Sequence, residues 1–352
     1  MAADPQRILV RATNWVGDAV MSLPALHALR RRFPRAVLAV AARPWVLDLY
    51  RREPCIDEWI PYTAPQGRSG LRAKLRFARR LATRNFDCAI LFQNAFEAAL
   101  IAWAARIPRR IGYARDGRSL LLTDAIPVPK PGQLPPHERY YYLELLRRAG
   151  LLDSLPQVDS IRLEGTDKAR QAGLGQFRQW NVAGPVIGVS PGAAYGGAKR
   201  WLPERFAEAA ASLAQARNGS VAVFGAPAEA DLCERVAEMA RRRGARVVNL
   251  GGATDLSGFI DLAAACDLFL TNDSGAMHIA AALGVPTVAV FGATDPAATG
   301  PAGPSVRVVR EPVECAPCLL RECPIDHRCM VRVTAARVVE EALGLLEPAR
   351  SC

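Results

Sequence analysis

A turn in the second half of the chain, Asn272-Asp273-Ser274-Gly275, lies between an apolar strand pattern and a helix pattern and could hold a phosphate. Such a turn presents unpaired backbone N–H groups and the positive end of a helix dipole, which together favour an anion. His278 would lie near the first turn of the helix and could donate to the same anion. Singly, Asp273 could be only a helix cap and His278 only a surface residue. The cluster Asp-Ser-Gly-x-x-His between two parallel strands is more specific than its parts.

A second candidate for phosphate binding is the glycine-rich stretch from Pro191 to Pro203, which follows the strand pattern PVIGVS. Closely spaced glycines let the backbone approach a phosphate, and Lys199 would add a positive charge. A flexible connector is the plainer interpretation, but the glycines, the lysine and Trp-x-Pro together favour binding. Farther along, Glu229 could accept hydrogen bonds from ribose hydroxyls, or it could only complement a helix dipole.

Asp18 carries a carboxylate that could transfer a proton. It follows the first strand pattern, RILVR, and the loop of residues 12–17. The common role of an aspartate there is a helix N-cap. At the carboxyl end of a parallel sheet, the same carboxylate could instead act as a general base. The loop lacks G-x-G-x-x-G, which argues against a dinucleotide site.

Two α/β halves are needed to position these side chains. In the first half, strands at 7–11 and 36–41 flank a helix that opens at Asp18, whose apolar residues recur at helical spacing and should face a sheet: Val20, Leu23, Leu26 and Leu29. In the second half, strand patterns alternate with helix patterns and lie at 185–190, 220–224, 247–250, 267–271, 287–291 and 306–309. The segment 151–165, with its Asp, Ser and Pro clusters, is predicted to link the halves.

Length and composition fit this division. The chain has 352 residues, half of them hydrophobic, which favours two domains with sizeable cores. No apolar run reaches the roughly 20 residues that a membrane helix needs. The N-terminus, MAADPQRILV, runs directly into a strand and carries no signal peptide, which predicts a cytoplasmic protein.

The net positive charge is confined to the first half. Residues 1–160 hold 25 Lys and Arg against 14 Asp and Glu, whereas residues 161–352 hold 20 of each. Arginines gather at 63–84, with Lys74 among them, and at 109–118. They could be solvated surface charges, or they could form a cationic rim for an anionic partner such as a phosphorylated glycolipid or a membrane surface. Nucleic acid is disfavoured because no recognition module or aromatic stacking platform is present.

Four cysteines, Cys315, Cys318, Cys323 and Cys329, fall within fifteen residues, with His327 among them. This spacing permits zinc or an iron–sulfur centre, and it equally permits a disulfide or a reduced loop. Cys88 and Cys266 lie beside apolar strand patterns and are predicted to be small core residues. Cys352 is interpreted as a tail residue.

The segment TNDSGAMHIAAALGVPTVAVFG resembles the sugar-nucleotide-binding segment of the lipopolysaccharide heptosyltransferases, glycosyltransferases of the GT-B architecture. Residues 13–25 and 187–204 also match that family. NWVGDAVMSLPAL is especially similar to members that add the second heptose, and CAPCLLRECPIDHRCM resembles a stretch in the same members. The resemblance covers nearly the whole chain.

The resemblance implies a role for each matching residue. Asp18 would be the base that activates the acceptor hydroxyl, and Lys199 would stabilise the departing ADP. The other donor-binding residues would be Gly192, Ala193, Glu229, Thr254, Asp273, Ser274, Gly275 and His278. The acceptor would be bordered by Thr13, Asn14, Trp15, Arg68, Arg72 and Arg115. No catalytic metal or other cofactor is expected, and the cysteine segment is expected to be structural.

The implied fold is α/β, of GT-B type, with two Rossmann-like doubly wound domains facing across a cleft. Residues 1–163 would bind the acceptor, residues 164–332 would bind the ADP-sugar, and a helix in 333–352 would pack back toward the first domain. The implied reaction transfers L-glycero-D-manno-heptose from ADP-heptose to the phosphorylated heptosyl–Kdo–lipid A inner core, by a single displacement with inversion. The enzyme would be cytoplasmic and would touch the inner face of the inner membrane transiently.

Three alternatives remain at the level of sequence. The first keeps the fold but changes the substrate, as in a heptosyltransferase of type I or III or another sugar-nucleotide transferase. The second is a nicotinamide oxidoreductase, which the missing G-x-G-x-x-G disfavours. The third is a non-enzymatic protein that binds an anionic glycolipid or a nucleic acid.

Overall fold

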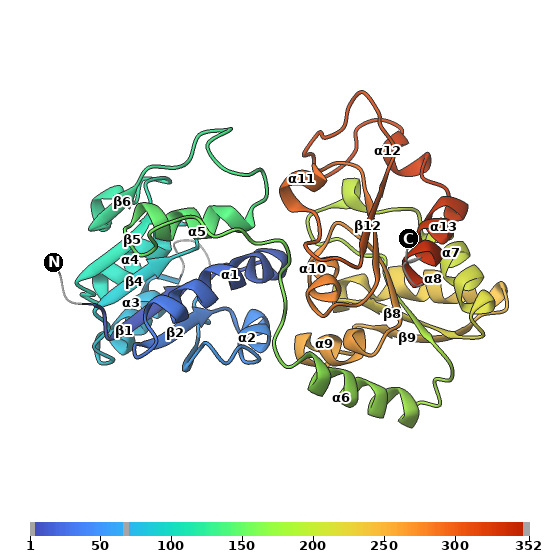
Figure 1. Cartoon of the computed structure of the whole chain (residues 1–352), viewed down its shortest axis with the longest axis horizontal. Helices are drawn as coiled ribbons and strands as arrows, with labels where there is room; N and C mark the ends of the chain where they lie inside the picture. The colour runs from blue at the N-terminus through green and yellow to red at the C-terminus, as the bar shows by residue number, and fades with distance from the viewer. Residues whose placement is uncertain (1–3, 66–69, 348–352) are drawn as a thin grey trace, which may run out of the picture. The chain divides into compact units, whose positions relative to one another are not determined.

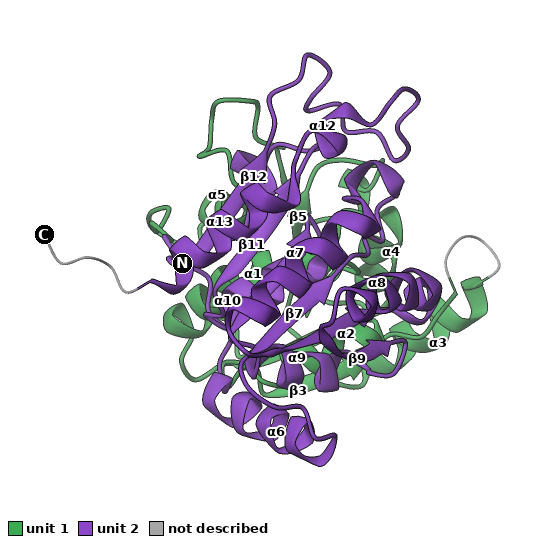
Figure 2. Ribbon diagram, turned by 90° about the vertical axis from the view of Figure 1, so that its right-hand side faces the viewer, with its two compact units in different colours: residues 1–158 green, residues 159–352 purple. Residues whose placement is uncertain are grey.

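The computed structural model describes residues 4–65 and 70–347, so Arg68 and Cys352, two residues singled out above, lie outside the described residues. The chain forms two compact units, residues 1–158 and residues 159–352, coloured separately in Figure 2. The boundary predicted after residue 163 therefore falls just inside the second unit. Each unit has its own six-stranded sheet, which confirms the predicted α/β class.

The first unit is built on a parallel sheet with strand order β3-β2-β1-β4-β5-β6 (Figure 1). Its strands are β1 (Arg7–Arg11), β2 (Val37–Ala42), β3 (Glu58–Pro61), β4 (Cys88–Leu91), β5 (Arg109–Tyr113) and β6 (Asp124–Ile126). Its helices are α1 (Val16–Arg32), α2 (Pro44–Tyr50), α3 (Leu71–Ala82), α4 (Phe96–Ala104), the short η2 (Ser119–Leu121) and α5 (Arg139–Arg148).

The second unit repeats this strand order with new strands. Its sheet is also parallel and runs β12-β11-β10-β7-β8-β9. The strands are β7 (Val186–Ser190), β8 (Ser220–Gly225), β9 (Arg246–Gly251), β10 (Leu268–Asn272), β11 (Thr287–Phe291) and β12 (Val306–Arg310). The helices are α6 (Thr166–Gln179), η3 (Gly197–Lys199), α7 (Pro203–Ala216), η4 (Pro227–Glu229), α8 (Ala230–Arg242), α9 (Leu256–Ala264), α10 (Gly275–Ala282), α11 (Pro296–Thr299), α12 (Arg328–Val331) and α13 (Ala335–Leu346).

Both orders are those of a doubly wound Rossmann-like sheet, in which the winding direction reverses between the two central strands. The central pairs are β1 with β4 and β7 with β10. Strands covered on both faces should be apolar along their whole length, because helices shield both sides from water. The sequence CAIL of β4 meets this condition, and TVAVF of β11 meets it after Thr287; every residue in both strands is buried.

Helix α1 is buried over most of its length, from Ala19 to Leu26 and again at Ala28 and Leu29. The residues predicted to face a sheet, including Val20 and Leu23, are all buried. The helix begins at Val16, two residues earlier than predicted, and Trp15 is its N-cap. Asp18 therefore lies inside the first turn rather than at the cap, where its negative charge complements the helix dipole.

The C-terminal helix α13 opens on a hydrogen bond from the Arg337 backbone N–H to the Thr334 hydroxyl (3.3 Å). It packs against α7, against the edge strand β12 and against the neighbouring strand β11 of the second unit. The expectation that this helix also packs toward the first half stays a prediction. Within residues 4–65 and 70–347, no helix combines the length and apolarity needed to cross a bilayer.

The prediction that the arginines of 109–118 are surface charges is wrong for Arg118, because its side chain is fully buried. The guanidinium donates to the carbonyls of Gln93 and Tyr113 and to Asn94 Oδ1, so it ties the loops after β4 and β5 together. Burial lowers the pKa of Arg118 to about 10, which still leaves it charged at neutral pH.

Replacing Arg118 with Met is expected to reduce the free energy of unfolding by about 2–4 kcal/mol, because the buried oxygens would lose their donors. Urea unfolding measures this change. Arg79→Met, on the exposed side of α3, is the matched control and should stay within about 0.5 kcal/mol of the unchanged chain. Equal stability of the two variants would contradict a structural role for Arg118.

Candidate active site

The predicted phosphate-binding stretches both leave the central strands of the second sheet. Strand β7 runs into the loop of residues 191–202, and β10 runs into the turn that opens α10. In doubly wound sheets, ligands bind outside the carboxyl ends of the strands at the point where the winding reverses. The two stretches, about 80 residues apart in sequence, therefore meet where such a site is expected.

An ion pair joins these two stretches directly. Lys199 Nζ lies 2.6 Å from Asp273 Oδ2, and the Thr294 hydroxyl donates to the same oxygen at 2.5 Å. Asp273 is 5% exposed, and the Lys199 side chain is 12% exposed. The interpretation of Asp273 as a helix cap is wrong, because the carboxylate holds Lys199 and Ser274 is the N-cap.

Lys199 is further positioned by an aromatic ring, with Nζ 4.7 Å from the centroid of Tyr195. A cation held over a ring and beside a carboxylate loses little freedom when an anion binds. The arrangement therefore presents one ordered positive charge at the carboxyl end of the second sheet.

Asn272, which was not predicted to contribute, fixes the loop against the sheet. Its Nδ2 donates to the Pro191 carbonyl at 2.7 Å, and its Oδ1 accepts from the Trp201 backbone N–H at 2.9 Å. On the other side, His327 Nε2 lies 3.1 Å from the Ala198 carbonyl. A polar residue ending a buried strand is the only sequence signal that could have indicated this role.

The remaining predicted donor residues lie around these elements. Ser274 is the N-cap of the eight-residue helix α10, which begins at Gly275. The Ser274 side chain makes no capping hydrogen bond, so it does not occupy the N–H groups of the first turn. His278 is 5% exposed, so the interpretation of a surface histidine is wrong. Ala193 is buried, and Thr254 is half-buried in the loop before α9.

Glu229 lies directly against Gly192. Its Oε2 accepts from the Ala226 backbone N–H at 3.0 Å, and a Cβ added at Gly192 would come within 2.1 Å of Oε1. A Cβ at this position would therefore push the Glu229 carboxylate aside, since real Cβ contacts are essentially never so short. Two predicted donor residues are thus brought together by the loops after β7 and β8.

If the predicted donor site is correct, Gly192→Ala is expected to displace Glu229 and to raise KM for the predicted nucleotide-sugar donor about tenfold, equivalent to roughly 1.4 kcal/mol of binding. Steady-state kinetics with varied donor measures the effect. Gly175→Ala is the control, because a Cβ there meets nothing within 4 Å. An unchanged KM in Gly192→Ala would remove Glu229 from the donor site.

In the first unit, Asp18 lies beside two buried tyrosines. Burial raises the pKa of both Tyr50 and Tyr142, and the negative charge of Asp18 raises them further. Ser22 Oγ lies 3.2 Å from the Tyr50 hydroxyl. The two tyrosines, which the sequence did not single out, therefore stay neutral and line the surroundings of the predicted base.

The residues predicted to border the acceptor follow β1. Thr13 is buried, and its hydroxyl donates to the Trp15 carbonyl at 3.5 Å. The Asn14 carbonyl accepts from Trp45 Nε1 at 3.3 Å. Trp15 is 54% exposed although it is a large apolar side chain.

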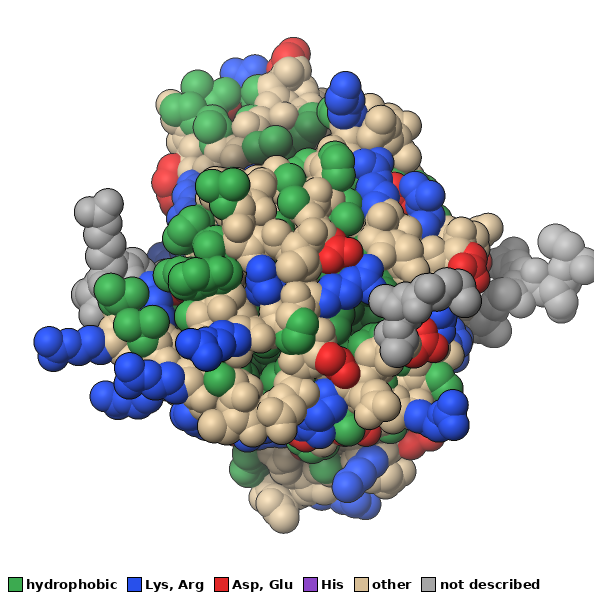
Figure 3. Space-filling model, turned by 90° about the vertical axis from the view of Figure 1, so that its left-hand side faces the viewer, with side chains coloured by type: hydrophobic (Ala, Val, Ile, Leu, Met, Phe, Trp, Pro, Cys, Tyr) green, Lys and Arg blue, Asp and Glu red, His purple; other side chains and the backbone are tan. Residues whose placement is uncertain are grey.

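The basic stretches are only partly surface features. Lys74 is buried and pairs with Glu97 at 2.5 Å, so its assignment to a cationic rim is wrong. Arg109 pairs with Asp124 at 3.0 Å, and Arg72 and Arg115 are exposed. Figure 3 shows basic side chains spread over one face with acidic ones among them. The rim is thus smaller than the sequence suggested.

The cysteine segment carries free thiols. Cys315 is exposed, Cys318 and Cys323 are half-buried, and Cys329 is buried against Gly292. Among the described residues, these cysteines do not form a group spaced to hold a metal ion. The segment instead contacts the β7 loop, since the Arg321 carbonyl accepts from the Ala198 N–H at 2.9 Å. This contact fits a structural role.

Known proteins resemble this chain over nearly its full length. A family model described as glycosyltransferase family 9 (heptosyltransferase) matches residues 74–328. Lipopolysaccharide heptosyltransferase 2 of Escherichia coli is 32% identical over 97% of this chain and 98% of its own. Lipooligosaccharide heptosyltransferase 2 of Haemophilus ducreyi is 31% identical over 97% of this chain and 99% of its own. The solved structure of E. coli ADP-heptose LPS heptosyltransferase II matches with a TM-score of 0.81 and 30% sequence identity. The match covers 97% of this chain and 98% of that structure's chain.

These similarities confirm the predicted GT-B architecture and show that the chain is a transferase enzyme. The alternatives of a nicotinamide oxidoreductase and of a non-enzymatic binding protein are thereby excluded. The roles of individual residues stay predictions, because the comparisons do not test them. The chain belongs to glycosyltransferase family 9, the heptosyltransferases.

Proposed function

We propose that this enzyme transfers L-glycero-D-manno-heptose from ADP-heptose to the heptosyl–Kdo–lipid A inner core of lipopolysaccharide. The observation that carries the proposal is the Lys199–Asp273 pair, which places one ordered cation at the reversal point of the second sheet. The identity of the sugar and of the acceptor rests on the similarity to heptosyltransferase 2 proteins.

The second unit would bind the donor. The diphosphate would lie between Lys199 and the first turn of α10, where the helix dipole and the N–H groups of Ser274 and Gly275 favour negative charge. His278 could supply a further donor. Glu229 would accept hydrogen bonds from the ribose, with Gly192 and Ala193 allowing close approach. Thr254 would lie near the adenine.

The first unit would bind the acceptor and supply the base. Asp18 would remove the proton from the acceptor hydroxyl, and that oxygen would form its bond to the anomeric carbon of heptose as the bond to ADP breaks. Attack opposite the leaving group inverts the anomeric centre. Negative charge growing on ADP would be stabilised by Lys199. The proposal assigns no metal ion to this step and requires Asp18 and Lys199 to face the same pair of substrates.

Acceptor recognition would use exposed residues of the first unit. Thr13, Asn14 and Trp15 would border the sugar, and Arg72 and Arg115 would pair with phosphate groups. On α3 the exposed arginines alternate with exposed Leu71 and Leu75. A basic helix face with apolar side chains suits transient contact with an anionic membrane surface, which would bring a cytoplasmic enzyme to its lipid-linked acceptor.

Acceptors that differ by one heptose test the function directly. The enzyme is incubated with ADP-heptose and lipopolysaccharide truncated to Kdo–lipid A, to one heptose or to two heptoses, and the products are weighed by mass spectrometry. A gain of one heptose residue on the one-heptose acceptor alone is expected. Transfer only to Kdo–lipid A, or only to the two-heptose acceptor, would overturn the proposed acceptor in favour of a type I or type III activity. No transfer from ADP-heptose to any acceptor would overturn the donor assignment.

A further inference from the structure

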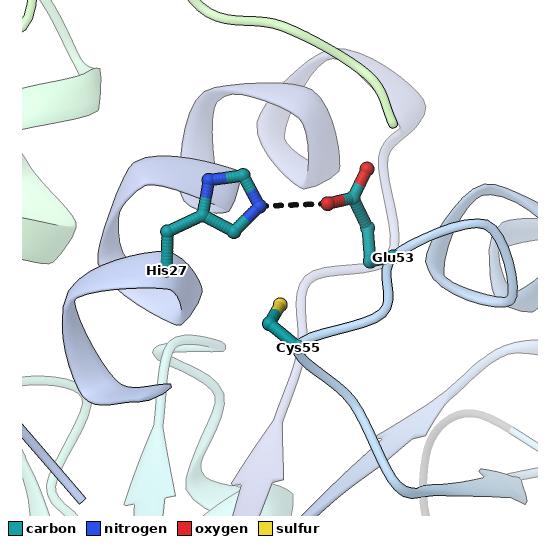
Figure 4. A group of neighbouring side chains, drawn as sticks. All are labelled: His27, Glu53 and Cys55. Atoms are coloured by element: carbon teal, nitrogen blue, oxygen red, sulfur yellow. Dashed lines mark hydrogen bonds and ion pairs between the residues drawn. The ribbon is translucent and has the colours of Figure 1, made fainter. Parts of the chain in front are cut away.

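Three side chains outside the proposed active site bring together the kinds of atoms that bind transition metals. His27 comes from α1, and Glu53 and Cys55 come from the segment between α2 and β3 (Figure 4). One ligand atom from each residue lies within 4.8 Å of the other two. Across residues 4–65 and 70–347, this is the one group of three His, Cys, Asp or Glu residues with such spacing.

The three side chains point toward one another and are held by burial (Figure 4). His27 Nε2 lies 2.7 Å from Glu53 Oε2, and Glu53 and Cys55 are both buried. The His27 side chain is 28% exposed, which leaves a route from solvent.

We propose that His27, Glu53 and Cys55 form a zinc-binding site. Thiolate, imidazole and carboxylate are the three ligand types of protein zinc sites, at about 2.0–2.3 Å from the metal. Tetrahedral ligands at those lengths lie roughly 3.3–3.8 Å from one another. To reach that geometry, the His27–Glu53 contact would open from 2.7 Å, while the two atom pairs that involve Cys55 already lie within 4.8 Å. A thiolate ligand disfavours magnesium and calcium, which prefer oxygen.

Three protein ligands leave the fourth position of zinc for water. The ion would not take part in heptosyl transfer, because His27 follows Asp18 by nine residues on α1 and lies about 13 Å farther along the helix axis. It would instead fasten α1 to the segment before β3. The same two segments are already joined by Arg30, whose Nε donates to the Cys55 carbonyl at 3.0 Å and whose guanidinium pairs with Asp57. The site would thus brace the helix that carries the proposed base.

Metal titration of the full chain tests the site. The cysteine segment is a second possible thiolate ligand, so all measurements are made in a C315S/C318S/C323S background as well as in the unchanged chain. Zinc content after dialysis and the thiolate-to-cobalt absorption band on adding Co²⁺ are measured. One equivalent of zinc is expected in both proteins. Cys55→Ser and His27→Gln should each weaken Co²⁺ binding at least tenfold.

Two further measurements separate loss of the site from loss of the fold. Circular dichroism establishes that each variant is folded, and Glu53→Gln serves if another variant does not fold. Zinc should raise the Tm of the C315S/C318S/C323S protein but not that of the same protein carrying Cys55→Ser. Zinc that persists at one equivalent in Cys55→Ser and His27→Gln, or that disappears in the C315S/C318S/C323S protein, would overturn the proposal. Absence of stoichiometric zinc from every protein would overturn it as well.

Discussion

Asp18→Asn is expected to lower kcat by about 10²–10⁴-fold while the enzyme binds ADP-heptose as tightly as before. The amide keeps the shape of the carboxylate but cannot accept the proton of the acceptor hydroxyl. Because Asp18 belongs to the first unit and the donor residues belong to the second, the substitution leaves the donor groups unchanged. Turnover and the dissociation constant of the donor are measured separately, by single-turnover kinetics and calorimetry.

Asp48→Asn is the matched control for this variant. Asp48 lies on the neighbouring helix α2 and pairs with Arg51 at 2.7 Å, so its loss removes a surface ion pair and no proposed catalytic group. Its kcat should stay within about twofold of the unchanged enzyme. Asp18→Asn with full turnover would show that another group accepts the proton. Loss of turnover together with donor binding would point to misfolding instead.

Lys199→Met should have the second large effect, lowering kcat about 10²–10³-fold, because the charge that grows on the leaving group would lose its counter-ion. The same substitution should reduce the free energy of unfolding by about 3–5 kcal/mol, since it leaves the buried Asp273 carboxylate without its cation. Activity and stability therefore fall together in this variant, and a second substitution is needed to separate them.

The double variant Lys199→Met/Asp273→Asn separates the two effects. Neutralising both partners removes the buried uncompensated charge, so stability should recover most of the loss while turnover remains low. The buried pair Lys74–Glu97 in the first unit is the control, and Lys74→Met/Glu97→Gln should keep donor binding. Recovery of turnover in the Lys199/Asp273 double variant would mean that the pair serves the fold and not the reaction.

The two units use one strand order for different chemistry. After β1, a short loop without closely spaced glycines leads into α1 and places a carboxylate in its first turn. After β7, a longer glycine-containing loop leads through η3 and places a lysine beside the start of α10. The reversal of winding between β1 and β4, and again between β7 and β10, therefore provides two positions for a ligand in one chain.

Positions of most strands could be predicted because the signal is local. The apolar runs at β1, β7, β8, β10 and β11 are recognisable from neighbouring residues alone, and the observed bounds differ from the predicted ones by at most one residue. The site stretches could also be predicted, since glycine density and the Asp-Ser-Gly turn are short-range features. Helix α1 was placed two residues late because Trp15, an unusual N-cap, carries no cap signal.

The sequence alone determined the class of fold, the two units and the stretches that carry the candidate chemistry, because hydrophobic period and turn composition are properties of neighbouring residues. Tertiary structure decided which partner each charged side chain has. Asp273 holds Lys199 from 74 positions away, and Arg118 spans loops from two strands. A charged residue has the same local sequence signal whether it is solvated or buried. Whether it is buried depends on which distant group pairs with it after the sheet has brought the strand ends together.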